Sequence, residues 1–131
     1  MIKQLGKSDC ILACIAMAAN KTYAECFSNE FIEKIQTLKG CHGDMIDTAF
    51  KTAGFEKDKD YKKIYTFNKD IYLIRPLLWG RKAIFQVPSL NYPDTEHAIF
   101  CTNAGEILDP STLQTYTNLN QIFPTYTWVF N

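Results

Sequence analysis

The run CILACIAMAA (10–19) restricts the fold of this chain more than any other part of its sequence. A helix over this run would be apolar on every face, which in a soluble protein requires burial on all sides. The run is too short to span a bilayer, so it predicts a buried helix and not a membrane span. Either Ser8 or Asp9 can cap the helix, because each offers a side-chain oxygen to the exposed N–H groups of the first turn.

Two amphipathic helices are predicted after this run. In residues 23–38 the apolar side chains recur at offsets of three and four, at Phe27, Phe31, Ile32, Ile35 and Leu38. Residues 44–53 carry a second apolar stripe. For this second helix we expect Asp44 as the N-cap and Gly54 as the left-handed residue that ends it.

Aromatic and β-branched residues dominate the second half of the chain and predict strands. The expected strands cover 64–67, 82–90, 97–103, 106–110 and 126–131. A tight turn at 103–105 would join two of them into a hairpin. Helices followed by antiparallel strands are typical of the α+β class, so we expect residues 1–131 to form a single α+β domain.

Charge and cysteine content exclude several functions. Lys plus Arg and Asp plus Glu both number 14, so the chain lacks the basic excess that nucleic-acid binding needs. Five cysteines at irregular spacing argue against a secreted disulfide framework and favour reduced thiols in the cytoplasm. We expect no membrane insertion. Cys41 and His42 have no second pair at zinc-ligand spacing, so they predict a loop and not a metal site.

Cys10, His97 and Asp109 could form a nucleophile, its base and the group that orients the base. Cys10 lies in the first turn of the buried helix, where the helix dipole favours a thiolate. His97 begins one strand of the predicted hairpin and Asp109 ends the other, so the two residues should nearly face each other. Gln4, six residues before Cys10, could stabilise an oxyanion together with the Cys10 backbone N–H.

From the residues alone, each of these candidates also has a structural explanation. Cys10 could be a buried helix thiol, and His97 an ordinary strand histidine. Asp109 followed by Pro110 commonly starts a turn. Gln4 could be an exposed residue near the N-terminus.

At these positions the sequence resembles the bacteriocin-processing cysteine peptidases, which are papain-like domains that remove double-glycine leader peptides. In QLGKSDCILACIAM (4–17), Gln4, the pair Asp9-Cys10 and Cys14 stand where the family has its Gln, its Asp-Cys pair and a second Cys. The resemblance runs over about residues 3–112. Four further segments resemble, in order, the family's next helix, a strand, its histidine strand and its Asp-Pro turn, namely GDMIDTAFKTAGFE (43–56), AIFQVPSL (83–90), HAIFC (97–101) and ILDP (107–110).

The resemblance implies a papain-like fold and hydrolysis of a peptide bond through a thioester. Cys10, His97 and Asp109 would be the catalytic triad, Gln4 would assist in the oxyanion hole, the substrate would be a peptide or protein, and no cofactor would be needed. The family usually has Gly after the nucleophile, where this chain has Ile11, whose branched side chain would narrow the substrate cleft. Two alternatives stay open: a non-peptide amidase or acyltransferase with the same triad, and an inactive peptidase-like module that binds a peptide or a partner protein.

Overall fold

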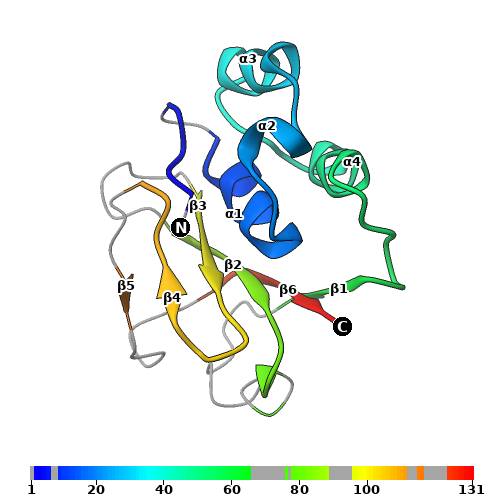
Figure 1. The fold of residues 1–131 in the computed structure, drawn as a ribbon, viewed down its shortest axis with the longest axis vertical. Helices are drawn as coiled ribbons and strands as arrows, with labels where there is room; N and C mark the ends of the chain where they lie inside the picture. Colours follow the sequence, from blue (N-terminus) through cyan, green and yellow to red (C-terminus); the bar gives the residue numbers. More distant parts are fainter. Residues whose placement is uncertain are drawn as a thin grey trace.

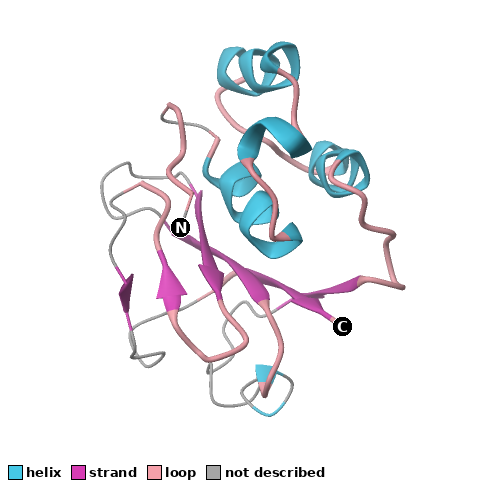
Figure 2. Cartoon of the chain, viewed as in Figure 1, coloured by secondary structure: helices cyan, strands magenta, loops and turns pink. Residues whose placement is uncertain are grey.

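The computed structural model describes residues 2–6, 9–65, 76, 78–88, 96–111, 115–116 and 124–131. Within these residues the helices lie together on one face of an antiparallel sheet (Figure 1). Figure 2 distinguishes the helices from the strands. In the chain the named helices come first and the strands follow. The architecture is therefore α+β, as the sequence predicts.

The described helices are α1 (Cys10–Ala19), α2 (Tyr23–Cys26), α3 (Asn29–Thr37) and α4 (Asp44–Thr52). The bounds of α1 are those predicted from the apolar run. The prediction of one continuous helix over 23–38 is wrong, because Phe27 and Ser28 have extended backbones and separate α2 from α3. The Ser28 hydroxyl accepts the N–H of Phe31 and begins a new helix, a local capping signal that outweighs the apolar periodicity.

Two predicted caps are also corrected. Asp44 is the first residue of α4, and Gly43 occupies the N-cap position. Asp9 occupies the N-cap position of α1, but its side chain makes no capping hydrogen bond and turns toward the preceding loop instead. Gly54 follows α4 at a φ of 99° and ends it as predicted, since a left-handed backbone suits glycine.

The sheet has the strand order β1-β6-β2-β3-β4-β5, and all its strand pairs are antiparallel. The strands are β1 (Tyr61–Tyr65), β2 (Ala83–Pro88), β3 (Glu96–Cys101), β4 (Ile107–Leu108), β5 (Thr115–Tyr116) and β6 (Tyr126–Phe130). Strand β1 begins earlier than predicted, and β5 was not predicted. Residues 66–67 and 89–90 of two predicted strands lie outside the described residues. The turn at 103–105 joins β3 to β4 as predicted, with the Gly105 N–H donating to the Thr102 carbonyl.

Helix α1 lies inside the molecule, between the sheet and the other helices (Figure 1). All its residues from Ile11 to Ala18 are buried, as the all-apolar pattern requires. The opposite face of the sheet has a second apolar cluster, consisting of Leu78, Ala83, Phe85, Ile99, Cys101, Ile107 and Val129. None of the described helices is long and apolar enough to cross a membrane.

Candidate active site

Cys10 is the first residue of α1 and is only partly buried. Among the cysteines it alone begins a helix, as predicted, and its backbone N–H belongs to the first turn, where N–H groups lack partners within the helix. The backbone N–H of Ala98 donates to the Cys10 sulfur at 3.4 Å. Since Ala98 directly follows His97, this contact fixes the thiol next to the histidine.

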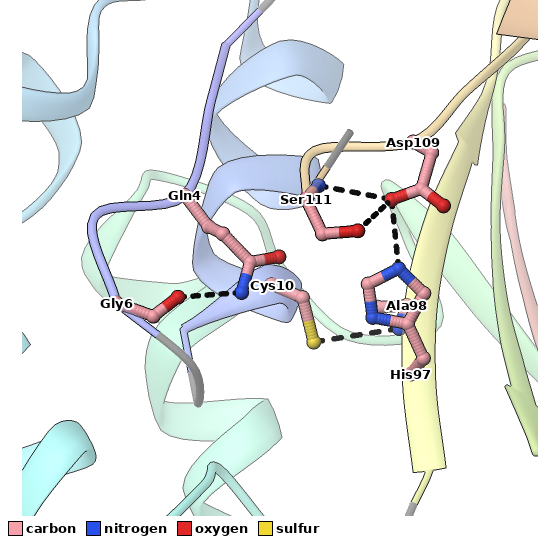
Figure 3. A network of polar contacts seen from close by, with 7 residues as sticks. All are labelled: Gln4, Gly6, Cys10, His97, Ala98, Asp109 and Ser111. Atoms are coloured by element: carbon pink, nitrogen blue, oxygen red, sulfur yellow. Dashed lines mark hydrogen bonds and ion pairs between the residues drawn. The ribbon is translucent and has the colours of Figure 1, made fainter. Parts of the chain in front are cut away.

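His97 and Asp109 are joined by a contact of 2.8 Å between the histidine Nε2 and the carboxylate Oδ1. Both side chains are largely buried, with 20% and 14% of their surface exposed. Figure 3 shows the imidazole between the carboxylate and the thiol of Cys10. Because a carboxylate can only accept, Nε2 carries the ring proton in this contact, and the other ring nitrogen is left for the thiol.

The strand register places His97 and Asp109 slightly differently from the prediction that they nearly face each other. Strand β4 ends at Leu108, which pairs with Phe100, and Asp109 follows it outside the ladder. Asp109 is therefore not a cross-strand partner of His97, which pairs with Val87 of β2, and the two residues meet through the 2.8 Å contact of their side chains. The two side chains meet as expected, although the two residues are not paired across the strands.

The electrostatics of the site favour a charged imidazole. Burial by itself lowers the pKa of His97, but hydrogen bonding to Asp109 and to Cys10 outweighs it and raises the pKa of His97 to about 10. Burial raises the pKa of Asp109, yet hydrogen bonds from His97 and Ser111 hold the pKa at about 2. At neutral pH the pair is therefore an ionised carboxylate facing a protonated imidazole.

Ser111 is a member of the site that sequence reasoning missed. Its backbone N–H and its hydroxyl donate to the same Asp109 oxygen that contacts His97, at 2.9 and 2.7 Å. The spacing Asp-Pro-Ser offers the one sequence signal, since Asp side chains in turns commonly accept from the N–H two residues later. Ser111 thus holds the Asp109 carboxylate in the orientation that His97 requires (Figure 3).

Gln4 lies next to the Asp109 turn, because its backbone N–H donates to the carbonyl of Pro110 at 3.0 Å. Its side-chain nitrogen donates to the carbonyl of Gly6 at 2.6 Å, which uses one of the two amide hydrogens. Its side-chain oxygen is buried and has no hydrogen-bond partner among the described residues. The segment that carries Gln4 is therefore docked on the turn after Asp109, and the second amide hydrogen has no hydrogen-bond partner among the described residues.

The remaining cysteines are poor nucleophiles, because burial disfavours the thiolate. Burial raises the pKa of Cys14 and that of Cys26. It also raises the pKa of Cys41 to about 12 and that of Cys101 to about 11. Cys10 is the cysteine whose thiol faces the His97 imidazole, so chemistry at a thiol points to this position.

Two further predictions concern the surroundings of the thiol. Ile11 is 6% exposed and belongs to the apolar core, so its side chain packs inward and is not an exposed obstacle in front of Cys10. Cys41 and His42 lie in the loop before α4, as predicted. The described part of the chain contains no cluster of three His, Cys, Asp or Glu side chains that could hold a metal ion.

Comparison of the chain with protein-family models, with curated proteins and with solved structures found no match.

Proposed function

We propose that this chain is a cysteine peptidase with a papain-like fold, in which Cys10, His97 and Asp109 form the catalytic triad. The observation that carries the proposal is the position of His97, between the Asp109 carboxylate and the Cys10 thiol. The three residues come from a helix N-terminus, a strand and a turn that are far apart in the sequence. The resemblance of residues 4–17 and 97–110 to the bacteriocin-processing peptidases supports the same assignment.

The reaction follows from the roles that each group can take. Before the substrate binds, the thiol proton passes to the ring nitrogen of His97 that does not face Asp109, which gives a thiolate beside an imidazolium. The Cys10 thiolate then attacks the carbonyl carbon of an amide. His97 then returns the proton to the leaving amine, which leaves a thioester on Cys10. In the second half, His97 takes a proton from water, the hydroxide attacks the thioester, and the acid product leaves as the thiol is restored.

The oxyanion of each tetrahedral intermediate needs hydrogen-bond donors. The Cys10 backbone N–H is one candidate donor, and the second side-chain hydrogen of Gln4 is the other. Loss of such a donor typically lowers the rate by about 100- to 1,000-fold. The substrate class is a peptide or protein amide, with a leader peptide as the specific candidate that the resemblance suggests.

The test is alkylation of the purified protein with iodoacetamide between pH 5 and 9, followed by intact mass and site mapping. We expect Cys10 to react first and to remain reactive well below pH 8, since the adjacent imidazolium stabilises a thiolate. His97→Ala should remove this low-pH reactivity. His42→Ala is the matched control, because His42 is the other histidine of the chain and lies in the loop before α4.

The outcomes separate an enzyme from a binding module. Selective reaction of Cys10 that depends on His97 but not on His42 supports an activated Cys–His pair. Reaction of Cys10 at the rate of an ordinary thiol, with no effect of His97→Ala, refutes the proposal. The chain would then be a peptidase-like module that binds a peptide or a partner protein.

A further inference from the structure

Asp9 is a buried carboxylate that the triad does not use. It is 0% exposed, and a buried carboxylate is costly unless hydrogen bonds compensate it. Two backbone N–H groups from the preceding loop donate to it, that of Leu5 at 2.8 Å and that of Gly6 at 2.8 Å. The carboxylate therefore holds the backbone of residues 5 and 6, directly after Gln4.

Two side chains from other helices complete the shell of Asp9. The side-chain amide of Gln36 on α3 donates to Oδ1 at 2.7 Å, and the hydroxyl of Tyr23 on α2 donates to Oδ2. Burial, together with the hydrogen bond to Asp9, raises the pKa of Tyr23, so the hydroxyl keeps its proton and remains a donor. We name Asp9, Tyr23 and Gln36 the Asp9 cluster.

A continuous path of hydrogen bonds leads from the Asp9 cluster to the proposed oxyanion hole. The carboxylate of Asp9 fixes the N–H groups of Leu5 and Gly6. The Gly6 carbonyl in turn accepts the side-chain nitrogen of Gln4 at 2.6 Å. The Gln4 amide is therefore held by the carbonyl of Gly6, a residue whose own N–H the Asp9 carboxylate fixes.

Gly6 shows how tightly this path is packed. A Cβ atom added to Gly6 would lie 2.3 Å from the side-chain nitrogen of Gln36, the same nitrogen that donates to Asp9. Any larger residue at position 6 would displace the Gln36 amide from the carboxylate. Because that amide ends a flexible side chain, the substitution would move Gln36 without straining the backbone.

We propose that Tyr23 and Gln36 are positioning residues of the proposed peptidase, which act through Asp9 on the Gly6 carbonyl and thereby aim the Gln4 amide at the developing oxyanion. The inference rests on the proposed function, because it assigns a role in the same site. Tyr23 and Gln36 would assist the addition of Cys10 to a carbonyl, but they would not activate the thiol. Reactions of Cys10 with and without an oxyanion should therefore separate the two roles.

The test compares two reactions of the same thiol in each variant. With iodoacetamide the Cys10 sulfur bonds to a saturated carbon and iodide leaves, so no oxyanion forms. With p-nitrophenyl acetate the Cys10 sulfur attacks the ester carbonyl, p-nitrophenolate leaves, and an S-acetyl thioester remains, so a tetrahedral oxyanion must form. The quantity measured is the rate of acylation, from the burst of p-nitrophenolate, divided by the rate of alkylation at the same pH.

We expect Tyr23→Phe and Gln36→Ala each to lower this ratio at least tenfold, while Gln4→Ala lowers it by about 100-fold or more. Tyr61→Phe is the matched control. The Tyr61 hydroxyl also donates to a carboxylate, that of Asp47 at 3.0 Å, and the side chain is 1% exposed. Because that contact joins α4 to β1 and not the loop before Cys10, Tyr61→Phe should leave the ratio unchanged.

Gly6→Ala provides a second test. It should lower the ratio in the wild-type background by displacing Gln36, and it should cause no further loss when combined with Gln36→Ala. Equal ratios, within twofold, in wild type, Tyr23→Phe, Gln36→Ala and Tyr61→Phe would overturn the inference while leaving the peptidase intact. A wild-type protein that is neither alkylated selectively nor acylated at Cys10 would instead refute the proposed function, and the inference with it.

Discussion

The contact between His97 and Asp109 should make the stability of the fold depend on pH in a defined window. The pKa of His97 is raised from 6.5 to about 10, so its contribution is complete below pH 6.5 and is lost as the pH rises toward 10. The pKa of Asp109 is lowered from 3.8 to about 2, so its contribution is complete above pH 3.8 and is lost as the pH falls toward 2. The stabilisation from the pair is therefore greatest between about pH 4 and 6.5.

The size of this stabilisation follows from the smaller of the two pKa shifts, that of Asp109. The pKa of Asp109 falls by 3.8 minus about 2, and each pKa unit corresponds to about 1.4 kcal/mol, which gives roughly 2 kcal/mol for the contacts of Asp109. The change at His97 is larger because Cys10 also acts on the imidazole. The Cys10→Ala variant removes that second effect and isolates the pair.

The assay compares Cys10→Ala with the double variant Cys10→Ala/Asp109→Asn. In Cys10→Ala the NMR titration of the His97 ring should have a midpoint above 6.5, and Asp109→Asn should lower it by about 1 to 2 pH units. In urea unfolding, the double variant should be less stable by roughly 2 kcal/mol at pH 6, and this difference should shrink toward pH 9. Parallel stability curves, or an identical His97 midpoint in both variants, would show that the contact does not couple the two charges.

Three further predictions concern the surroundings of the site. Ser111→Ala removes one of the donors to Asp109. In the Cys10→Ala background, the midpoint of the His97 titration should therefore fall by less than with Asp109→Asn. An effect as large as that of Asp109→Asn would contradict the view that Ser111 only orients the carboxylate. Thr22→Ala breaks the capping box that begins α2 and should lower the free energy of unfolding in urea by about 1 kcal/mol. Thr48→Ala is the control, because it removes only a hydrogen bond to the carbonyl of the preceding turn, and it should cost less than half as much. Phe50→Ala removes a fully buried ring stacked on Tyr61 and should cost about 3–5 kcal/mol; a loss below about 1 kcal/mol would mean that this part of the core repacks freely.

The sequence predicts the parts of the structure whose signals are local. An unbroken apolar run allows only a buried helix, and α1 has the predicted bounds. The turn at 103–105 brings β3 and β4 together, and with them His97 and Asp109. The prediction failed where a local cap competed with a longer pattern. The apolar periodicity of 23–38 continues through Ser28, yet the hydroxyl of Ser28 ends the pattern by capping a new helix.

Asp9 shows why the rest of the site could not be read from local signals. Next to an apolar helical run, an Asp predicts an N-cap, because the nearest unsatisfied donors are the N–H groups of the first turn. The fold instead supplies donors from residues 5 and 6 and from α2 and α3, and the carboxylate binds these. The contacts of the Asp9 side chain with two helices and a loop depend on tertiary packing. The spacing of residues within the motif therefore cannot predict them. The motif Gln…Asp-Cys therefore has a residue proposed for chemistry at each end, Gln4 and Cys10. Between them, Asp9 is the residue that holds the backbone of residues 5 and 6 in place.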